Sequence, residues 1–159
     1  MAAIGDVDEA NSAIGVALLH LDGQAAAMLG RIQNEMFDLG ADLATPGEDF
    51  TPSETALRIV PGQIARLERE IDRMNEDLAP LKSFILPGGG AAAASLHLAR
   101  SVVRRAERSA VKAAKAVALN PLALVYINRL SDHLFVMARW AAREEGGDVL
   151  WQPGATRGA

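Results

Sequence analysis

The sequence of 159 residues contains no cysteine, few aromatic residues and no long apolar run. Without cysteine the chain can form neither a disulfide nor a thiolate metal site, which fits a reducing compartment. Aromatic residues make up only 4% of the chain whereas alanine is abundant, and this favours close-packed helices over a β-sandwich. No apolar stretch reaches the roughly 18 residues that a membrane span needs. Charged and polar residues follow Met1 closely, so we expect no secretory leader and a cytoplasmic location.

Familiar catalytic motifs are also missing. The sequence suggests no Ser–His–Asp arrangement, no HExxH motif and no P-loop. The histidines His20, His97 and His133 are far apart, and none belongs to a Glu-x-x-His pair, which argues against a di-iron site in a helical bundle. Acidic residues outnumber basic ones by 20 to 16, so nucleic acid is not expected as the main partner.

Apolar spacing predicts five helices within a single domain, residues 1–159. In the first, Asp6 is the expected N-cap and Glu9 completes a capping box. The fold class is predicted to be all-α, a bundle of four long antiparallel helices plus one. The expected helices cover about residues 5–21, 24–43, 61–78, 91–119 and 121–145.

Three of the helix ends carry clear signals. Pro61 and Pro121 suit the first turn of a helix, where the missing N–H is not needed. Asn120 is the expected N-cap of the last helix. Gly146 and Gly147 are expected to end that helix.

The predicted fourth helix concentrates positive charge in a net negative chain. Its segment LHLARSVVRRAERSAVKAAKAVAL holds six arginine and lysine residues and one acid, Glu107. On a helical wheel Arg100, Arg104 and Glu107 share a face beside the apolar stripe. The first interpretation is a solvated face with ion pairs of about 0.2–0.5 kcal/mol each. The second is an oxyanion clamp, because guanidinium groups match phosphate oxygens and stay charged. The wheel leaves both open. The stripe consists of Ala99, Val102, Val103, Ala106, Ala110, Ala113 and Val117.

Other polar positions also have two interpretations. The run LPGGGAAAA lets the backbone approach a ligand ahead of a helix N-terminus, or it is a flexible linker. Asp8 lies beside the apolar stripe of the first helix, where it is either functional or a helix-end acid. Asn128 and Asp132 are one turn apart on the fifth helix, where they are either functional or a satisfied polar pair.

Several motifs then occur in a specific order: GDVDEANSAIG, IQNEMFDLGADLATP, SFILPGG, LHLARSVVRRAER, INRLSDHLFVMAR and DVLW. Together they resemble the PduO-type ATP:cob(I)alamin adenosyltransferases from about residue 6 to residue 151. The resemblance implies a five-helix bundle that forms trimers, with active sites at the subunit interfaces. It also implies an enzyme that transfers the 5′-deoxyadenosyl group of ATP to cobalamin and releases triphosphate.

The resemblance assigns roles to the polar residues. Asp8, Arg100 and Phe84 would be catalytic, with Asp8 paired to Arg100 and Phe84 beneath the corrin ring of cobalamin. The residues at the ATP site would be Arg104, Glu107 and Asn128. Mg²⁺ would come with ATP, and Glu107 is the one candidate protein ligand for it.

Phe84 would keep water and the dimethylbenzimidazole base away from cobalt, which eases reduction of cob(II)alamin. The chain also lacks the Asp-x-His-x-x-Gly motif, which supplies a cobalt ligand in other cobalamin proteins. If Phe84 had no such role, it would be an ordinary core aromatic.

One part of the family pattern is not visible in the printed chain, which starts at MAAIGDVDEA. We expect it to lack the Thr-, Gly- and Asp-rich segment that wraps the ATP phosphates in the family. A reductase and an adenosylcobalamin-dependent enzyme are the expected protein partners. The alternatives are a non-catalytic cobalamin carrier or helical scaffold, and a nucleic-acid-binding helix.

Overall fold

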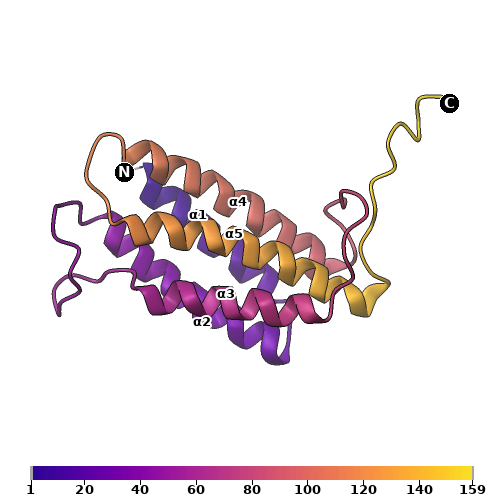
Figure 1. The fold of residues 1–159 in the computed structure, drawn as a ribbon, viewed down its shortest axis with the longest axis horizontal. Helices are drawn as coiled ribbons and strands as arrows, with labels where there is room; N and C mark the ends of the chain where they lie inside the picture. Colours follow the sequence, from indigo (N-terminus) through magenta and orange to yellow (C-terminus); the bar gives the residue numbers. More distant parts are fainter. Residues whose placement is uncertain (1, 159) are drawn as a thin grey trace.

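The computed structural model describes residues 2–158, and nearly all of its regular structure is helical (Figure 1). The all-α bundle of five helices is therefore confirmed. Among the described residues, no helix is long and apolar enough to cross a membrane. The elements in chain order are α1 (Ala2–Leu18), α2 (Gly23–Leu43), α3 (Pro61–Glu76), α4 (Ala91–Ala113), α5 (Pro121–Ala142) and the 3₁₀ turn η1 (Arg143–Glu145).

The five helices surround one apolar core. α1 packs against α2 and α4, and α5 packs against α4 and α3. Two ion pairs join α2 to α3. Arg31 pairs with Glu70 at 2.6 Å, and Arg66 pairs with Glu35. The buried Tyr126 of α5 donates to Glu35 at 2.8 Å across the middle of the bundle. The interior of the bundle is therefore mostly apolar, and its few polar groups, such as Tyr126 and Glu35, are hydrogen-bonded to each other.

The expected start of the first helix is wrong. α1 begins at Ala2, so Asp6 and Glu9 lie inside the helix and form no capping box. The carboxylate of Asp6 accepts a hydrogen bond from the Ser109 hydroxyl, and Glu9 forms an ion pair with Arg105. Both acids therefore join α1 to α4, and this contact replaces the cap expected from the sequence.

The expected end of the fourth helix is also wrong. α4 ends at Ala113, and Val117 is 45% exposed instead of continuing the apolar stripe. The turn after Ala113 lets Leu119 and Asn120 enter the interior, where both are buried. Burial of these two residues outweighs the helical preference of the intervening alanines and lysine.

The start of α5 is confirmed. The side chain of Asn120 accepts from the Leu122 amide at 3.0 Å and donates to the buried carboxylate of Asp42 at 2.7 Å. Pro121 occupies the first turn, as Pro61 does in α3. At the far end, Gly146 adopts φ 100° after η1, which is the left-handed conformation that glycine favours.

Candidate active site

The first part of the site is a polar cluster between α4 and α5. Arg104 Nη1 lies 2.5 Å from Glu107 Oε2, and Asn128 Nδ2 donates to Glu107 Oε1 at 2.8 Å. Both oxygens of Glu107 are therefore engaged, and its side chain is only 14% exposed. The Arg104 side chain is 43% exposed and uses one guanidinium nitrogen for Glu107. The carboxylate thus orients an arginine and an amide that face outward.

The second part is Arg100, one turn before Arg104 on α4. Its guanidinium carbon lies 5.4 Å from the centre of the Phe135 ring on α5. In the described part of the chain, no carboxylate lies within ion-pair distance of Arg100, in contrast to Arg104 and Arg105. A guanidinium held over an aromatic face without an acid partner can bind an added anion.

Arg100 borders a cavity of about 530 Å³. Phe135 forms one wall, and the loop between α3 and α4 contributes Phe84 and three of its neighbours. The side chain of Phe84 is 78% exposed, so it is not the core aromatic that the sequence left as an alternative. The cavity therefore places a cation and two aromatic rings around one space. The three neighbours are Leu81, Ser83 and Ile85.

Asp8 lies on α1 and does not border the cavity beside Arg100. It lines a groove of about 260 Å³ between α1 and α2, together with Asn11 and the exposed ring of Phe37. No ion pair within the described chain joins Asp8 to Arg100. The buried Oδ1 atom of Asn11 has no hydrogen-bond partner in this groove. A single chain therefore brings five of the six predicted site residues to one side of α4 and α5, and leaves Asp8 apart.

Phe135 was not identified from the sequence, although its ring contacts both Arg100 and His97. His97 packs edge-on against the Phe135 ring at 6.1 Å between centroids, and Arg100 lies over the same ring. Burial lowers the pKa of His97, and the charge of Arg100 lowers it further. A signal was present in the sequence, because Phe135 lies seven residues after Asn128 and so shares its side of a helix.

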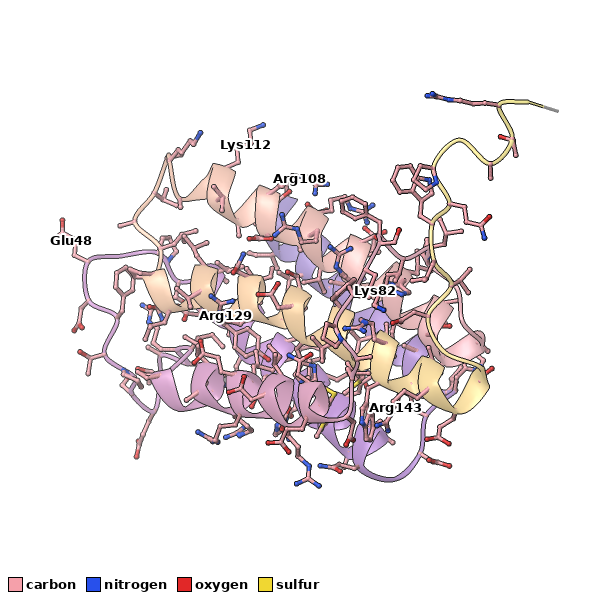
Figure 2. The ribbon with its side chains drawn as sticks, turned by 45° about the vertical axis from the view of Figure 1, so that its right-hand side comes forward. Glu48, Lys82, Arg108, Lys112, Arg129 and Arg143 are labelled. Atoms are coloured by element: carbon pink, nitrogen blue, oxygen red, sulfur yellow. The ribbon has the colours of Figure 1, made fainter. Side chains whose placement is uncertain are left out.

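Metal-binding side chains do not gather at this site. Among residues 2–158, no group of three or more His, Asp or Glu side chains could hold a metal ion. Figure 2 shows that Arg108 and Lys112 project outward from α4, and Arg108 donates to the Arg104 carbonyl at 3.0 Å. The local charge is therefore positive, which suits an anionic ligand better than a cation.

The fold and the site define an all-α protein in which a cavity bordered by Arg100 and two aromatic rings suits an anionic ligand beside an apolar surface. Residues 1–141 match the family described as Cobalamin adenosyltransferase. The chain belongs to this family.

Individual relatives agree with this assignment. The chain is 50% identical to the corrinoid adenosyltransferase of Mycobacterium tuberculosis over 163 residues, which cover 100% of this chain and 83% of that protein. It is 46% identical to the cobalamin adenosyltransferase of Cupriavidus metallidurans, over 94% of this chain and 79% of that one.

A solved structure also resembles the fold closely. It is a variant of the PduO-type ATP:corrinoid adenosyltransferase from Lactobacillus reuteri, complexed with cobalamin and ATP. Its TM-score is 0.82 at 38% identity, over 95% of this chain and 84% of that chain. The present chain is accordingly an ATP:corrinoid adenosyltransferase of the PduO type, a transferase that forms adenosylcobalamin from ATP.

Proposed function

We propose that this chain transfers the 5′-deoxyadenosyl group of ATP to cob(I)alamin and releases triphosphate. The phosphates bind near Arg104 and Asn128, and the corrin ring lies against Phe84. The observation that carries this proposal is Arg100, a guanidinium without an acid partner at the edge of the cavity that Phe84 borders. An anion and an apolar ring system can meet there.

The reaction explains why the chain has no catalytic triad. The electron pair of cob(I) attacks C5′ of ATP, the cobalt–carbon bond forms, and the bond from C5′ to the phosphate oxygen breaks. The electron pair of cob(I) becomes the cobalt–carbon bond, and the leaving triphosphate takes the electron pair of the broken C5′–oxygen bond, so no general base is required. The chemistry belongs to the cobalamin, and the protein aligns the reactants and stabilises the leaving anion.

Arg104 suits the leaving group because most of its donors remain available. Guanidinium carries five N–H donors, and Glu107 engages only one of the three nitrogens. Glu107 therefore acts as an orienting residue for Arg104 and Asn128. Mg²⁺ is part of the substrate in this proposal, since it binds phosphates readily and needs only one or two carboxylates from a protein.

Phe84 serves the reduction that precedes transfer. Cob(I) is four-coordinate, so cob(II) is reduced more easily once its fifth ligand has gone. An exposed aromatic ring offers no polar atom to cobalt, and it excludes water and the dimethylbenzimidazole base from the lower face of the corrin. Its exposure of 78% leaves the ring available for this contact.

Asp8 completes the site from another copy of the chain in our proposal. Asp8 has no contact with Arg100 within one chain, and its groove contains the exposed Phe37 and the unpartnered Asn11 oxygen. In a homotrimer, Asp8 of one protomer would pair with Arg100 of the next. Each active site would then form at a boundary between two protomers.

The test is to mix the protein with Mg–ATP and pre-formed cob(I)alamin, and to record the visible spectrum of adenosylcobalamin formation. The released polyphosphate should be triphosphate, which ion-exchange chromatography separates from pyrophosphate. Light scattering should give the mass of a trimer, and Asp8→Asn should weaken both assembly and turnover. No adenosylcobalamin from the wild type, or a monomer with full activity, would contradict the proposal.

A further inference from the structure

The position of Phe84 depends on a loop with little structure of its own. The loop spans residues 77–90 between α3 and α4, and its only bridge pairs Ile85 with Leu150 among the described residues. Because Phe84 is mostly exposed, packing into the core does not fix its ring. The position of the Phe84 ring must therefore depend on contacts with residues outside the loop.

The C-terminal segment 148–151 supplies that support. The Leu86 amide donates to the Val149 carbonyl at 2.7 Å, and the Trp151 amide donates to the Phe84 carbonyl at 2.8 Å. Ser83 Oγ also donates to the Trp151 carbonyl at 3.0 Å. Figure 1 shows the loop and this segment side by side at the right-hand end of the bundle. Ser83, Phe84 and Leu86 are thus all hydrogen-bonded to one strand-like segment.

The ring of Phe84 has its own aromatic partner in the same segment. Trp151 meets it edge-to-face, with 6.0 Å between ring centroids and 62° between ring planes. Edge-to-face contact is a preferred geometry for aromatic pairs, because the positive edge of one ring meets the negative face of the other. Trp151 therefore limits the directions in which the Phe84 ring can point.

One buried arginine anchors both segments to the bundle. Arg139 of α5 donates from Nε to Asp148 at 2.9 Å and from Nη2 to the Ala79 carbonyl at 2.8 Å. The side chains of Arg139 and Asp148 are 9% and 17% exposed. Arg139 also lies one helical turn after Phe135, the wall of the cavity. A single guanidinium thus ties the start of the Phe84 loop and the start of the C-terminal segment to the helix that lines the site.

We propose that Arg139, Asp148 and Trp151 form a clasp that positions Phe84 for its contact with the corrin ring. All three are positioning residues, since they act on the substrate through Phe84. This inference rests on the function proposed above. It adds that the C-terminal segment is a working part of the active site, through the aromatic contact and the buried ion pair.

The first test measures loop order without any substrate. Amide hydrogen exchange at Leu86 should become several-fold faster in Asp148→Asn, which loses the ion pair, and in Trp151→Ala, which loses the ring contact. Gln152→Ala is the matched control, because Gln152 is the next residue and is exposed. Unchanged exchange at Leu86 in both clasp variants would overturn the proposal.

The second test measures the effect on the substrate. With ATP and cob(II)alamin bound, the four-coordinate signal in the paramagnetic resonance spectrum should fall several-fold in both clasp variants. Affinity for ATP and the helical circular dichroism should stay close to wild type. Trp151→Phe keeps an aromatic edge and should restore most of the signal, which a general loss of folding would not allow.

The two proposals fail in different ways. A wild-type protein that makes no adenosylcobalamin refutes the proposed function and, with it, the catalytic role of the clasp. An active wild type whose clasp variants keep the full four-coordinate signal refutes the clasp alone. Adenosylation from supplied cob(I) should fall less than adenosylation that begins with reduction of cob(II), and equal losses would count against the clasp.

Discussion

The substitution Arg104→Ala distinguishes a structural role of this arginine from a functional one. In the structure Arg104 is bonded to Glu107 and remains 43% exposed, so its removal leaves Glu107 with Asn128 as a partner. If Arg104 binds the triphosphate, the variant should fold normally and adenosylate slowly. If Arg104 only stabilises α4, the variant should be less stable and should adenosylate at the normal rate per folded molecule.

The two effects differ in size. A half-exposed ion pair contributes at most about 1 kcal/mol to stability, and solvent screening reduces this further. For a chain of this length that corresponds to a fall in Tm of roughly 2–4 °C. A charge-assisted contact to the triphosphate is worth about 1.5–3 kcal/mol. Its loss should lower kcat/KM for ATP by roughly 10- to 150-fold.

The assay is adenosylation of pre-formed cob(I)alamin at several ATP concentrations, with thermal unfolding followed by circular dichroism. Arg105→Ala is the matched control, since Arg105 is the next residue, is 44% exposed and is paired with Glu9 of α1. It should lose little activity. A Tm lowered by more than about 8 °C, with normal activity per folded molecule, would refute the functional role of Arg104.

Three further predictions follow from the same geometry. Phe84→Ala should abolish the four-coordinate cob(II)alamin signal while ATP affinity stays nearly constant, and a wild-type signal would show that the ring only fills space. Burial and Arg100 lower the pKa of His97, so the unfolded state binds more protons below about pH 6.5 and the protein loses stability as pH falls. His97→Gln should reduce this loss, as measured by Tm between about pH 7.5 and 5.5. Gly90→Ala should destabilise the fold by about 1–3 kcal/mol in urea unfolding, because Gly90 has φ 98°, which strains any residue with a side chain. The flexible Glu145 side chain can move away from the added carbon, so the backbone strain sets the cost, and an unchanged midpoint would contradict this.

The helices were predictable from sequence wherever local signals and packing agree. Pro61 and the Asn120–Pro121 pair mark helix starts that the structure confirms. Local signals failed where distant contacts decide the boundary. The Asp6 and Glu9 side chains match a capping box, yet they bond Ser109 and Arg105 of α4. α4 ends at Ala113 although nothing in the local sequence breaks it, because Leu119 and Asn120 are buried further on.

The site was predictable only in part. Helical spacing placed Arg100, Arg104 and Glu107 on one face, and the structure confirms that Arg104 and Glu107 are bonded to each other. Helical spacing places Phe135 on the same side of α5 as Asn128, but spacing within one helix cannot show that Arg100 of α4 lies over its ring. The support of Phe84 by Trp151 joins residues 67 positions apart and carries no local signal. The pairing of Asp8 with Arg100 stays a prediction.

The net positive charge of Arg100, Arg104 and Glu107 on α4 has a consequence for turnover. Arg100 and Arg104 supply two positive charges and Glu107 one negative charge, so these three residues leave a surplus of one positive charge. Groups that hold the leaving triphosphate most tightly in the transition state also hold it after the cobalt–carbon bond has formed. In the proposed reaction the adenosyl group departs with the corrin, whereas the triphosphate would keep its contacts with Arg100 and Arg104. We therefore expect product departure to be a slow step of the cycle, and free triphosphate to inhibit the enzyme competitively against ATP.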